Sequence, residues 1–208
     1  MARYTGAVCR LCRREKQKLF LKGDKCYSEK CPCDRRPTPP GMHGQGRSKT
    51  SEYGLQLREK QKCRRYYGIL ESQFEKYYDM AAARTGKTGT NLLSILETRL
   101  DNAVYRLGYA MSRPEARQLV LHAHFTLNGK KVTVPSILVK PGDVIAVSSK
   151  SQSLDKIKGN IEANASRVAP KWLEVDAANF SAKVIARPER DDIDLPIDEQ
   201  LIVEYYSK

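Results

Sequence analysis

The stretch SRPEARQLVLHAHFTLNGKKVTVPSILVKPGDVIAV, residues 112–147, decides the fold class because three local signals follow one another in it. Ser112 and Glu115 form a capping box, in which both side chains accept from backbone N–H groups that the first helical turn leaves unpaired. Asn128-Gly129 between two β-prone runs predicts a hairpin, because both turn residues must take a positive φ. Pro141-Gly142 then turns the chain into another strand. We therefore expect a small α+β module.

Around this module the sequence predicts three further regions. Residues 1–50 are rich in Pro and Gly and have no apolar periodicity. A hydrophobic core alone therefore cannot hold their shape, and we expect a cross-link to do so. Residues 51–98 have helical spacing, with helices expected from near residues 52 and 71 and over 91–107. The module covers 99–162. Residues 163–208 are expected to pack back on the helical domain, with short strands at 182–186 and 201–206.

The predicted fold class is therefore α+β. It combines a mostly helical domain, a metal-stapled N-terminal knuckle and an inserted small α+β module. In the module, Ala123 follows the helix that starts after Ser112. A left-handed conformation costs alanine about 1 kcal/mol, so we expect this helix to end without one.

The net charge of +13, from 37 Lys plus Arg against 24 Asp plus Glu, indicates a polyanionic partner, most simply nucleic acid. The charge is uneven: it is +9 over residues 1–50 and −3 over the last 58 residues. No apolar run approaches the roughly 20 residues of a membrane span, and the N-terminus lacks the apolar core of a signal peptide. We expect a cytosolic protein whose thiols stay reduced.

Five cysteines within residues 9–33 predict a metal site. Two residues separate Cys9 from Cys12, a spacing that lets both thiolates reach one tetrahedral ion. We assign Cys9, Cys12, Cys26 and Cys31 as ligands, with Cys33 as the alternative to Cys31. Zinc is the expected metal, and an iron–sulfur cluster is the alternative that four thiolates allow. Cys63, alone on a helix, is expected to pack in a core.

The basic side chains that can contact phosphate fall into two groups. One group surrounds the cysteines, the glycine-rich loop and one stripe of the first long helix. The other lies on the edges of two helices and at the hairpin tip, where it can grip a bent backbone by shape rather than by base sequence. The two groups comprise Arg10, Arg13, Arg14, Arg35, Arg36, Arg47, Arg58, Lys62 and Arg65, and Arg99, Arg106, Arg113, Arg117, His124, Lys130 and Lys131.

Several motifs in the module resemble the RNA-binding module named after protein four of the small ribosomal subunit, which also occurs in pseudouridine synthases and tyrosyl-tRNA synthetases. They are Arg99-Leu100-Asp101-Asn102, Ser112-Arg113-x3-Arg117, Asn128-Gly129-Lys130-Lys131 and Lys140-Pro141-Gly142-Asp143. The rest of the chain is similar to the bacterial ribosomal protein four family, in its cysteine-containing, zinc-binding subtype. The motifs there are Arg3-Tyr4-x-Gly6, Leu21-Lys22-Gly23, Arg35-Arg36, His43-Gly44 and the ending Glu204-Tyr205-Tyr206-Ser207.

The resemblance implies a non-enzymatic component of the cytoplasmic ribosome. Such a protein binds 16S ribosomal RNA early, nucleates assembly of the 30S body and contributes to accuracy near the mRNA entrance channel. The implied partners are 16S ribosomal RNA, small-subunit ribosomal proteins five and three, and mRNA, with no membrane. The resemblance adds Arg3, Lys22, His43 and Ser112 to the RNA-binding residues.

Two other function classes share these features. An RNA-modifying enzyme of the pseudouridine synthase type would use Asp101 of Arg99-Leu100-Asp101 as its nucleophile, but here the triplet is expected to lie within an amphipathic helix. A zinc-knuckle DNA-binding regulator would need a helix face of Arg, Asn and Gln for the major groove, and no such face is apparent. We expect no enzymatic activity.

Overall fold

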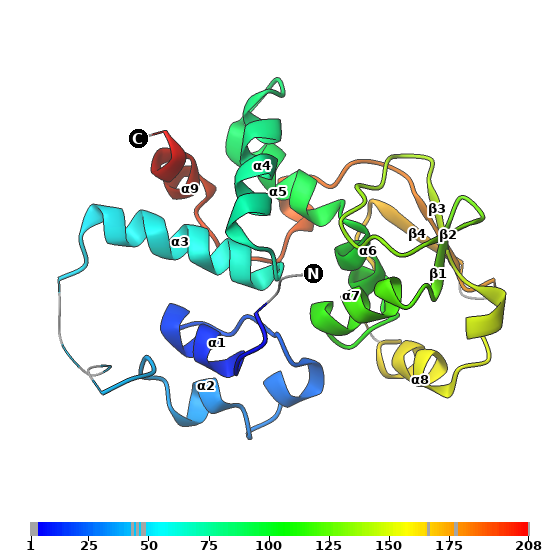
Figure 1. The fold of residues 1–208 in the computed structure, drawn as a ribbon, viewed down its shortest axis with the longest axis horizontal. Helices are drawn as coiled ribbons and strands as arrows, with labels where there is room; N and C mark the ends of the chain where they lie inside the picture. Colours follow the sequence, from blue (N-terminus) through cyan, green and yellow to red (C-terminus); the bar gives the residue numbers. More distant parts are fainter. Residues whose placement is uncertain are drawn as a thin grey trace. The chain divides into compact units, whose positions relative to one another are not determined.

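The computed structural model describes residues 4–42, 44, 46, 49–165, 167–176 and 179–207. The chain divides into two compact units, residues 1–92 with 195–208 and residues 93–194, so the first boundary falls inside a helix (Figure 1). The fold is mostly helical with one small antiparallel sheet. Among the described residues, no helix has the length and apolar character needed to cross a bilayer.

The first unit contains three short N-terminal helical segments and four longer helices, of which α5 is shared with the second unit. These elements, among the described residues, are α1 (Cys9–Glu15), the 3-10 turn Gly23–Cys26, α2 (Pro32–Arg35), α3 (Glu52–Tyr66), α4 (Glu71–Ala82), α5 (Thr88–Glu97) and α9 (Glu199–Tyr206). The Ser51 hydroxyl caps α3 by accepting from Gly54 N at 3.1 Å. Helix α1 packs on both α2 and α3.

Helix α9 corrects the strand expected over residues 201–206. Asp198 caps its start by accepting from Gln200 N, Ile202 is buried, and the helix packs along α3. A short apolar run fits either a strand or a helix by periodicity alone. The N-terminal cap and the neighbouring α3 decide for the helix.

The second unit contains α6 (Leu100–Arg106), α7 (Arg113–Leu121), α8 (Asp155–Ala163) and five strands. The strands are β1 (Phe125–Leu127), β2 (Lys130–Val132), β3 (Val144–Val147), β4 (Leu173–Asp176) and β5 (Ser181–Val184). Two further 3-10 turns lie at Ser149–Ser151 and Arg190–Asp192. The strand order in the sheet is β2-β1-β3-β5-β4, and each pair is antiparallel.

The single helix predicted over 91–107 is two helices, α5 and α6. Between them Arg99 is extended and pairs with Leu138 in an isolated bridge, while Val139 N donates to Thr98 O at 2.8 Å. Buried leucines continue on both sides of the break, with Leu92 and Leu96 before it and Leu100 after it. The amphipathic pattern therefore could not reveal the interruption.

The hairpin is confirmed: Asn128 and Gly129 take φ of 50° and 78°, and Phe125 pairs with Val132. The predicted strand near residue 182 is β5, which pairs with both β3 and β4. Residues 173–184 therefore complete the sheet of the module. Of the C-terminal segment expected from residue 163, the part from residue 195 groups with residues 1–92.

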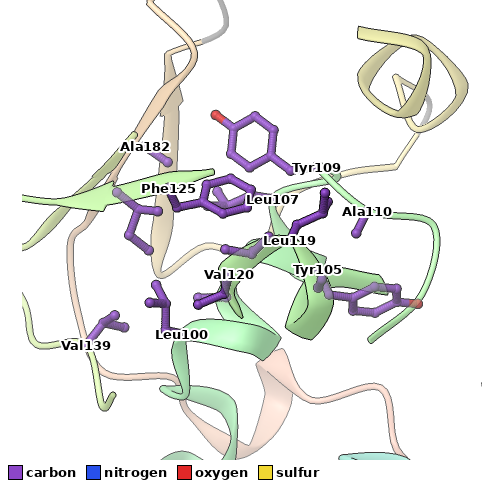
Figure 2. Close-up of a cluster of buried hydrophobic side chains, with 14 of the residues drawn as sticks. Leu100, Tyr105, Leu107, Tyr109, Ala110, Leu119, Val120, Phe125, Val139 and Ala182 are labelled. Carbon is purple, nitrogen blue, oxygen red and sulfur yellow. The ribbon is translucent and has the colours of Figure 1, made fainter. Parts of the chain in front are cut away.

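The core of the second unit lies between helices α6 and α7 and the sheet (Figure 2). Leu100, Val120, Phe125 and Ile145 have no solvent exposure. Burying apolar side chains of this size contributes about 1.5–3 kcal/mol each. This cluster fixes the two helices whose polar edges carry the predicted RNA-binding residues.

Helix α7 begins at the cap that the sequence predicted, but it ends in a conformation that was not expected. Ser112 accepts from Glu115 N, as predicted, but Glu115 Oε2 accepts from Met111 N at 2.9 Å. At the other end Ala123 has a φ of 60°, and His124 N donates to Leu119 O at 3.2 Å. This is a Schellman ending with alanine in the left-handed position, so the expectation of a different ending was wrong.

Candidate nucleic-acid interface

The five N-terminal cysteines gather in one part of the first unit. Cys9 and Cys12 lie on α1, Cys26 ends a 3-10 turn, and Cys31 and Cys33 begin α2, which packs on α1. Cys9 is half-buried and the other four are buried. Cys63 lies apart on α3 with no exposure, in the core position that its helical pattern predicted.

The thiols lie close enough to influence one another. Burial raises the pKa of Cys12 to about 11, a backbone hydrogen bond from Leu19 opposes this, and Cys33, Cys26 and Cys9 raise the pKa further. Lys22 N donates to Cys26 Sγ at 3.3 Å. Yet no group of three or more Cys, His, Asp or Glu side chains in the described part of the chain is arranged to hold a metal ion. The structure therefore contains a thiol cluster but not the metal-stapled knuckle expected from the spacing.

A buried carboxylate, Glu15, gathers the predicted cations of α3. Its Oε1 accepts from Arg58 Nη1 at 3.2 Å and from Arg65 Nη1. Burial raises the pKa of Glu15, and Arg65, Arg58, Arg14 and Lys62 oppose that shift. Four cations therefore surround one carboxylate, and the arginine side chains of α3 keep 29% and 19% of their exposure. The excess positive charge remains at the surface.

The other predicted cations of the N-terminal segment are mostly exposed. Arg13 is half-buried, and its Nε donates to Thr38 O at 2.9 Å, which ties α1 to the proline-rich turn. Arg3, His43 and Arg47 lie outside the described residues. The exposed ones are Arg10, Arg14, Lys22, Arg35 and Arg36.

Arg99 and Arg106 are buried, although the sequence predicted both on helix edges that contact phosphate. Arg99 is 2% exposed and makes two hydrogen bonds to Asp101, at 3.0 and 2.6 Å. Arg106 holds Glu97 with two hydrogen bonds, at 3.0 and 2.8 Å, and also pairs with Asp194. A buried guanidinium needs a carboxylate partner, and local sequence spacing did not identify these partners. In the structure both arginines serve the fold.

Arg113 and Arg117 also turn toward the interior, to different degrees. Arg113 is 5% exposed, donates to Asn102 Oδ1 at 2.8 Å and stacks on Tyr105. Arg117 is half-buried and pairs with Asp101 Oδ2 at 3.2 Å. These contacts lock α7 against α6, so their primary effect is on the shape of the module.

The hairpin tip supplies the exposed cations of the module. Lys130 and Lys131 on β2 are exposed. His124 lies near Lys131, and its Nδ1 and Ser151 Oγ are 2.9 Å apart. Burial, and then His122 and Lys131, lower the pKa of His124, so that this imidazole is neutral at pH 7. The predicted residues Lys131 and His124 are thus brought together, and Lys130 lies next to Lys131 on β2.

Several residues that organise the two units were not predicted. Lys60 on α3 is buried, pairs with Glu71 Oε1 at 2.7 Å and lies 4.3 Å from the Tyr205 ring centroid. Arg167, in the turn after α8, stacks on Tyr105 at 4.8 Å. Lys60 lies on a helix face that the sequence pattern marks as polar, and Arg167 is isolated in a polar loop. The sequence therefore contained no indication that either residue has a structural role.

Comparison with known proteins covers the chain from end to end. Residues 3–97 match the family "Ribosomal protein S4/S9 N-terminal domain", and residues 98–145 match the family "S4 domain". The chain is 65% identical to the small ribosomal subunit protein uS4 of Acetivibrio thermocellus over 208 residues, 100% of both chains. It is 64% and 62% identical to the proteins of that name from Ruminiclostridium cellulolyticum and Clostridioides difficile, again over the full length.

Proposed function

This chain belongs to the uS4 family of small-subunit ribosomal proteins, and from that premise we infer that it is a structural protein of the ribosome that binds small-subunit ribosomal RNA and catalyses no reaction. The observation that carries this inference is the 62–65% identity over the full length to proteins named for that subunit. Cytoplasmic location follows from membership of the ribosome.

The chemistry of the surface supports RNA as the partner. Exposed cations lie on α1, on α2 and at the hairpin tip, on backbone positions that the thiol cluster and the sheet hold in place. Such an array contacts phosphates and binds by shape, because A-form RNA hides most of its base code. We propose that two sets of exposed cations contact phosphates: Arg10, Arg14, Lys22, Arg35 and Arg36 in the first unit, and Lys130 and Lys131 in the second.

Finer roles are proposed from the family resemblance. We propose that the chain binds 16S ribosomal RNA early in assembly of the 30S subunit, and that it borders the mRNA entrance channel together with ribosomal proteins five and three. Its contribution there is to translational accuracy.

A structural zinc ion is also a proposal. Cys9, Cys12 and Cys26, with Cys31 or Cys33 as the fourth ligand, would hold it. Four buried or half-buried thiols in a segment of low apolar content suit that ion, and a thiolate ligand gains from N–H donors such as Lys22 N. The ion would supply a tetrahedral cross-link to residues 9–33. An iron–sulfur cluster, with the same thiols as its ligands, is the alternative to zinc.

Elemental analysis and a visible spectrum of anaerobically purified protein test this proposal. We expect one zinc per chain and no visible band. Cys33→Ser is expected to keep the metal and Cys31→Ser to lose it, and the reverse would move the ligand to Cys33. A brown protein with iron and sulfide would replace zinc by a cluster, and a protein without metal would contradict both.

The enzymatic alternative is disfavoured by the environment of Asp101. Both of its carboxylate oxygens accept from Arg99, and Oδ2 also accepts from Arg117, in a side chain that is 7% exposed. A nucleophile needs an oxygen free to reach a substrate. Asp101 instead braces α6 against α7.

The RNA-binding function is tested by filter binding of the full chain to transcribed 16S and 23S ribosomal RNA across a range of salt concentrations. We expect tight binding to 16S RNA that weakens steeply with salt, and weaker binding to 23S RNA. Lys130→Ala with Lys131→Ala should make the slope of log affinity against log salt shallower by about 1.4 to 1.8, the value for two phosphates.

The matched control removes two exposed lysines near β4 and β5, at the end of the sheet away from β2, by Lys171→Ala with Lys183→Ala. It loses the same charge and is expected to keep the wild-type slope. Equal binding of the wild-type chain to both RNAs would contradict the proposed function.

A further inference from the structure

Tyr105 is the platform for two arginines of the second unit. The guanidinium carbon of Arg113 lies 4.4 Å from the centroid of the Tyr105 ring, and that of Arg167 lies 4.8 Å from it. Both distances fall within the range of cation–π attraction. Figure 2 shows the Tyr105 ring at the margin of the apolar cluster, directed away from Phe125.

Three separate segments build this arrangement. Tyr105 lies on α6, Arg113 is the first residue of α7, and Arg167 belongs to the turn after α8. Asn164, the C-cap residue of α8, fixes that turn. Its side-chain Nδ2 donates to Gly108 O at 2.9 Å, and its backbone carbonyl accepts from Arg167 N at 2.8 Å. Gly108 permits the close approach: a Cβ there would lie 3.2 Å from that of Asn164.

The two arginines differ in burial and in the hydrogen bonds that their side chains make. Arg113 donates to Asn102 Oδ1 at 2.8 Å and is buried. Arg167 is half-buried, and no ion pair to it is found among the described residues. Its Nη1 is buried without a hydrogen-bond partner in the described part of the chain. An unmet guanidinium donor favours an acceptor that also carries negative charge.

We propose that Arg167, held on Tyr105 beside Arg113, binds a backbone phosphate of the RNA that this module recognises. The inference rests on the proposed RNA-binding function and adds a contact that lies far in sequence from the α6, α7 and hairpin residues. Tyr105 and Arg113 are positioning residues: the ring holds the guanidinium, and the second cation adds positive potential. A phosphate oxygen is the acceptor that Nη1 lacks.

The test is the salt dependence of binding of the full chain to transcribed 16S ribosomal RNA. Arg167→Ala is expected to weaken binding several-fold and to make the slope of log affinity against log salt shallower by about 0.7 to 0.9, the value for one phosphate. Arg167→Lys keeps the charge and is expected to restore the wild-type slope. The control is Arg187→Ala, which removes an exposed arginine of the same unit and should leave the slope unchanged.

A purely structural Arg167 would lower the thermal unfolding midpoint and leave the slope of Arg167→Ala equal to that of wild type, which overturns the proposal. An equal loss of slope in Arg187→Ala would overturn it too, because net charge alone would then explain the effect. If Arg167→Ala does not fold, Arg167→Gln gives the same comparison with the side-chain size preserved. Wild-type protein that binds 16S and 23S RNA equally would instead refute the proposed function.

Discussion

Glu15 in the first unit and Glu97 in the second are both carboxylates without meaningful exposure, yet they use their arginines differently. Glu97 accepts with both oxygens from Arg106, and its Oε2 also accepts from Asn102 at 2.5 Å. Glu15 binds Arg58 and Arg65 through Oε1 alone, while its Oε2 has no partner among the described residues. One carboxylate completes a buried network, and the other holds two partly exposed cations.

This difference separates arginines that build the fold from arginines that remain available to RNA. In the second unit Arg106 is 9% exposed and pairs with Glu97 and Asp194. In the first unit Arg58 and Arg65 keep contact with solvent, and two more cations share the same carboxylate. The composition of the two regions gave no indication of this division.

The largest expected effect concerns the thiols of the first unit, two of which lie on α1, the helix that carries Glu15. Cys12→Ala removes the buried thiol that Cys33, Cys26 and Cys9 surround. A structural zinc contributes roughly 10–16 kcal/mol in zinc-finger peptides, so the segment 9–35 should lose its order if the proposed ion is lost. Limited proteolysis followed by mass spectrometry measures this as new cleavage within 9–35.

Cys63→Ala is the matched control, because Cys63 is buried outside the cluster. It should leave the cleavage pattern of 9–35 unchanged. A Cys12→Ala protein as resistant as wild type in this segment would mean that the thiols are packed there as ordinary apolar side chains.

The next effect separates the two carboxylates directly. Glu97→Gln removes the buried carboxylate that pairs with the buried Arg106, and breaking a buried pair in this way costs about 3–5 kcal/mol. Glu15→Gln should cost far less, because burial already disfavours its charge and its arginines can turn to water. Urea unfolding at pH 7 measures both, and equal losses would erase the distinction.

A third effect is a difference of sign in pH dependence within the first unit. Bonds from Lys60 and Tyr206 outweigh burial and lower the pKa of Glu71 below 4.5, so its stabilisation is present above that pH and is lost as pH falls through the lowered pKa. Burial raises the pKa of Glu15, although Arg65, Arg58, Arg14 and Lys62 oppose it. Protonation of Glu15 therefore favours the folded state as pH falls toward 4.5.

Unfolding free energies of Glu71→Gln and Glu15→Gln, measured against wild type from neutral pH to below pH 4.5, check these signs. The deficit of Glu71→Gln should shrink with falling pH. The wild-type chain should gain relative to Glu15→Gln over the same range. Parallel curves for the two variants would show that the carboxylates are not held differently.

The smallest effect lies in the second unit. Ala123 occupies a left-handed position at the end of α7, so Ala123→Gly should stabilise the chain by about 0.5–1 kcal/mol. Ala163→Gly, at the exposed last residue of α8, is the control of opposite sign. Thermal unfolding measures both, and a destabilised Ala123→Gly would show that the Schellman ending is not strained.

The sequence predicted the features whose causes lie within a few residues. The Asn128-Gly129 hairpin and the Ser112 cap belong to this kind, since turn and cap geometry follow from neighbouring residues. The burial of Arg106 could not be predicted, because its partner Glu97 lies beyond the unforeseen break between α5 and α6, and its second partner Asp194 lies 88 residues away. Helix α9 was missed for the same reason, as α3 supplies the surface on which it forms.

Hydrogen exchange of the full chain, measured by mass spectrometry before and after removal of metal with a strong chelator, tests the central contrast most directly. The account predicts that amides of residues 9–35 lose protection on chelation, while those of residues 100–147, held by the apolar core, keep it. Unchanged protection of residues 9–35, or loss in both regions together, would contradict the account.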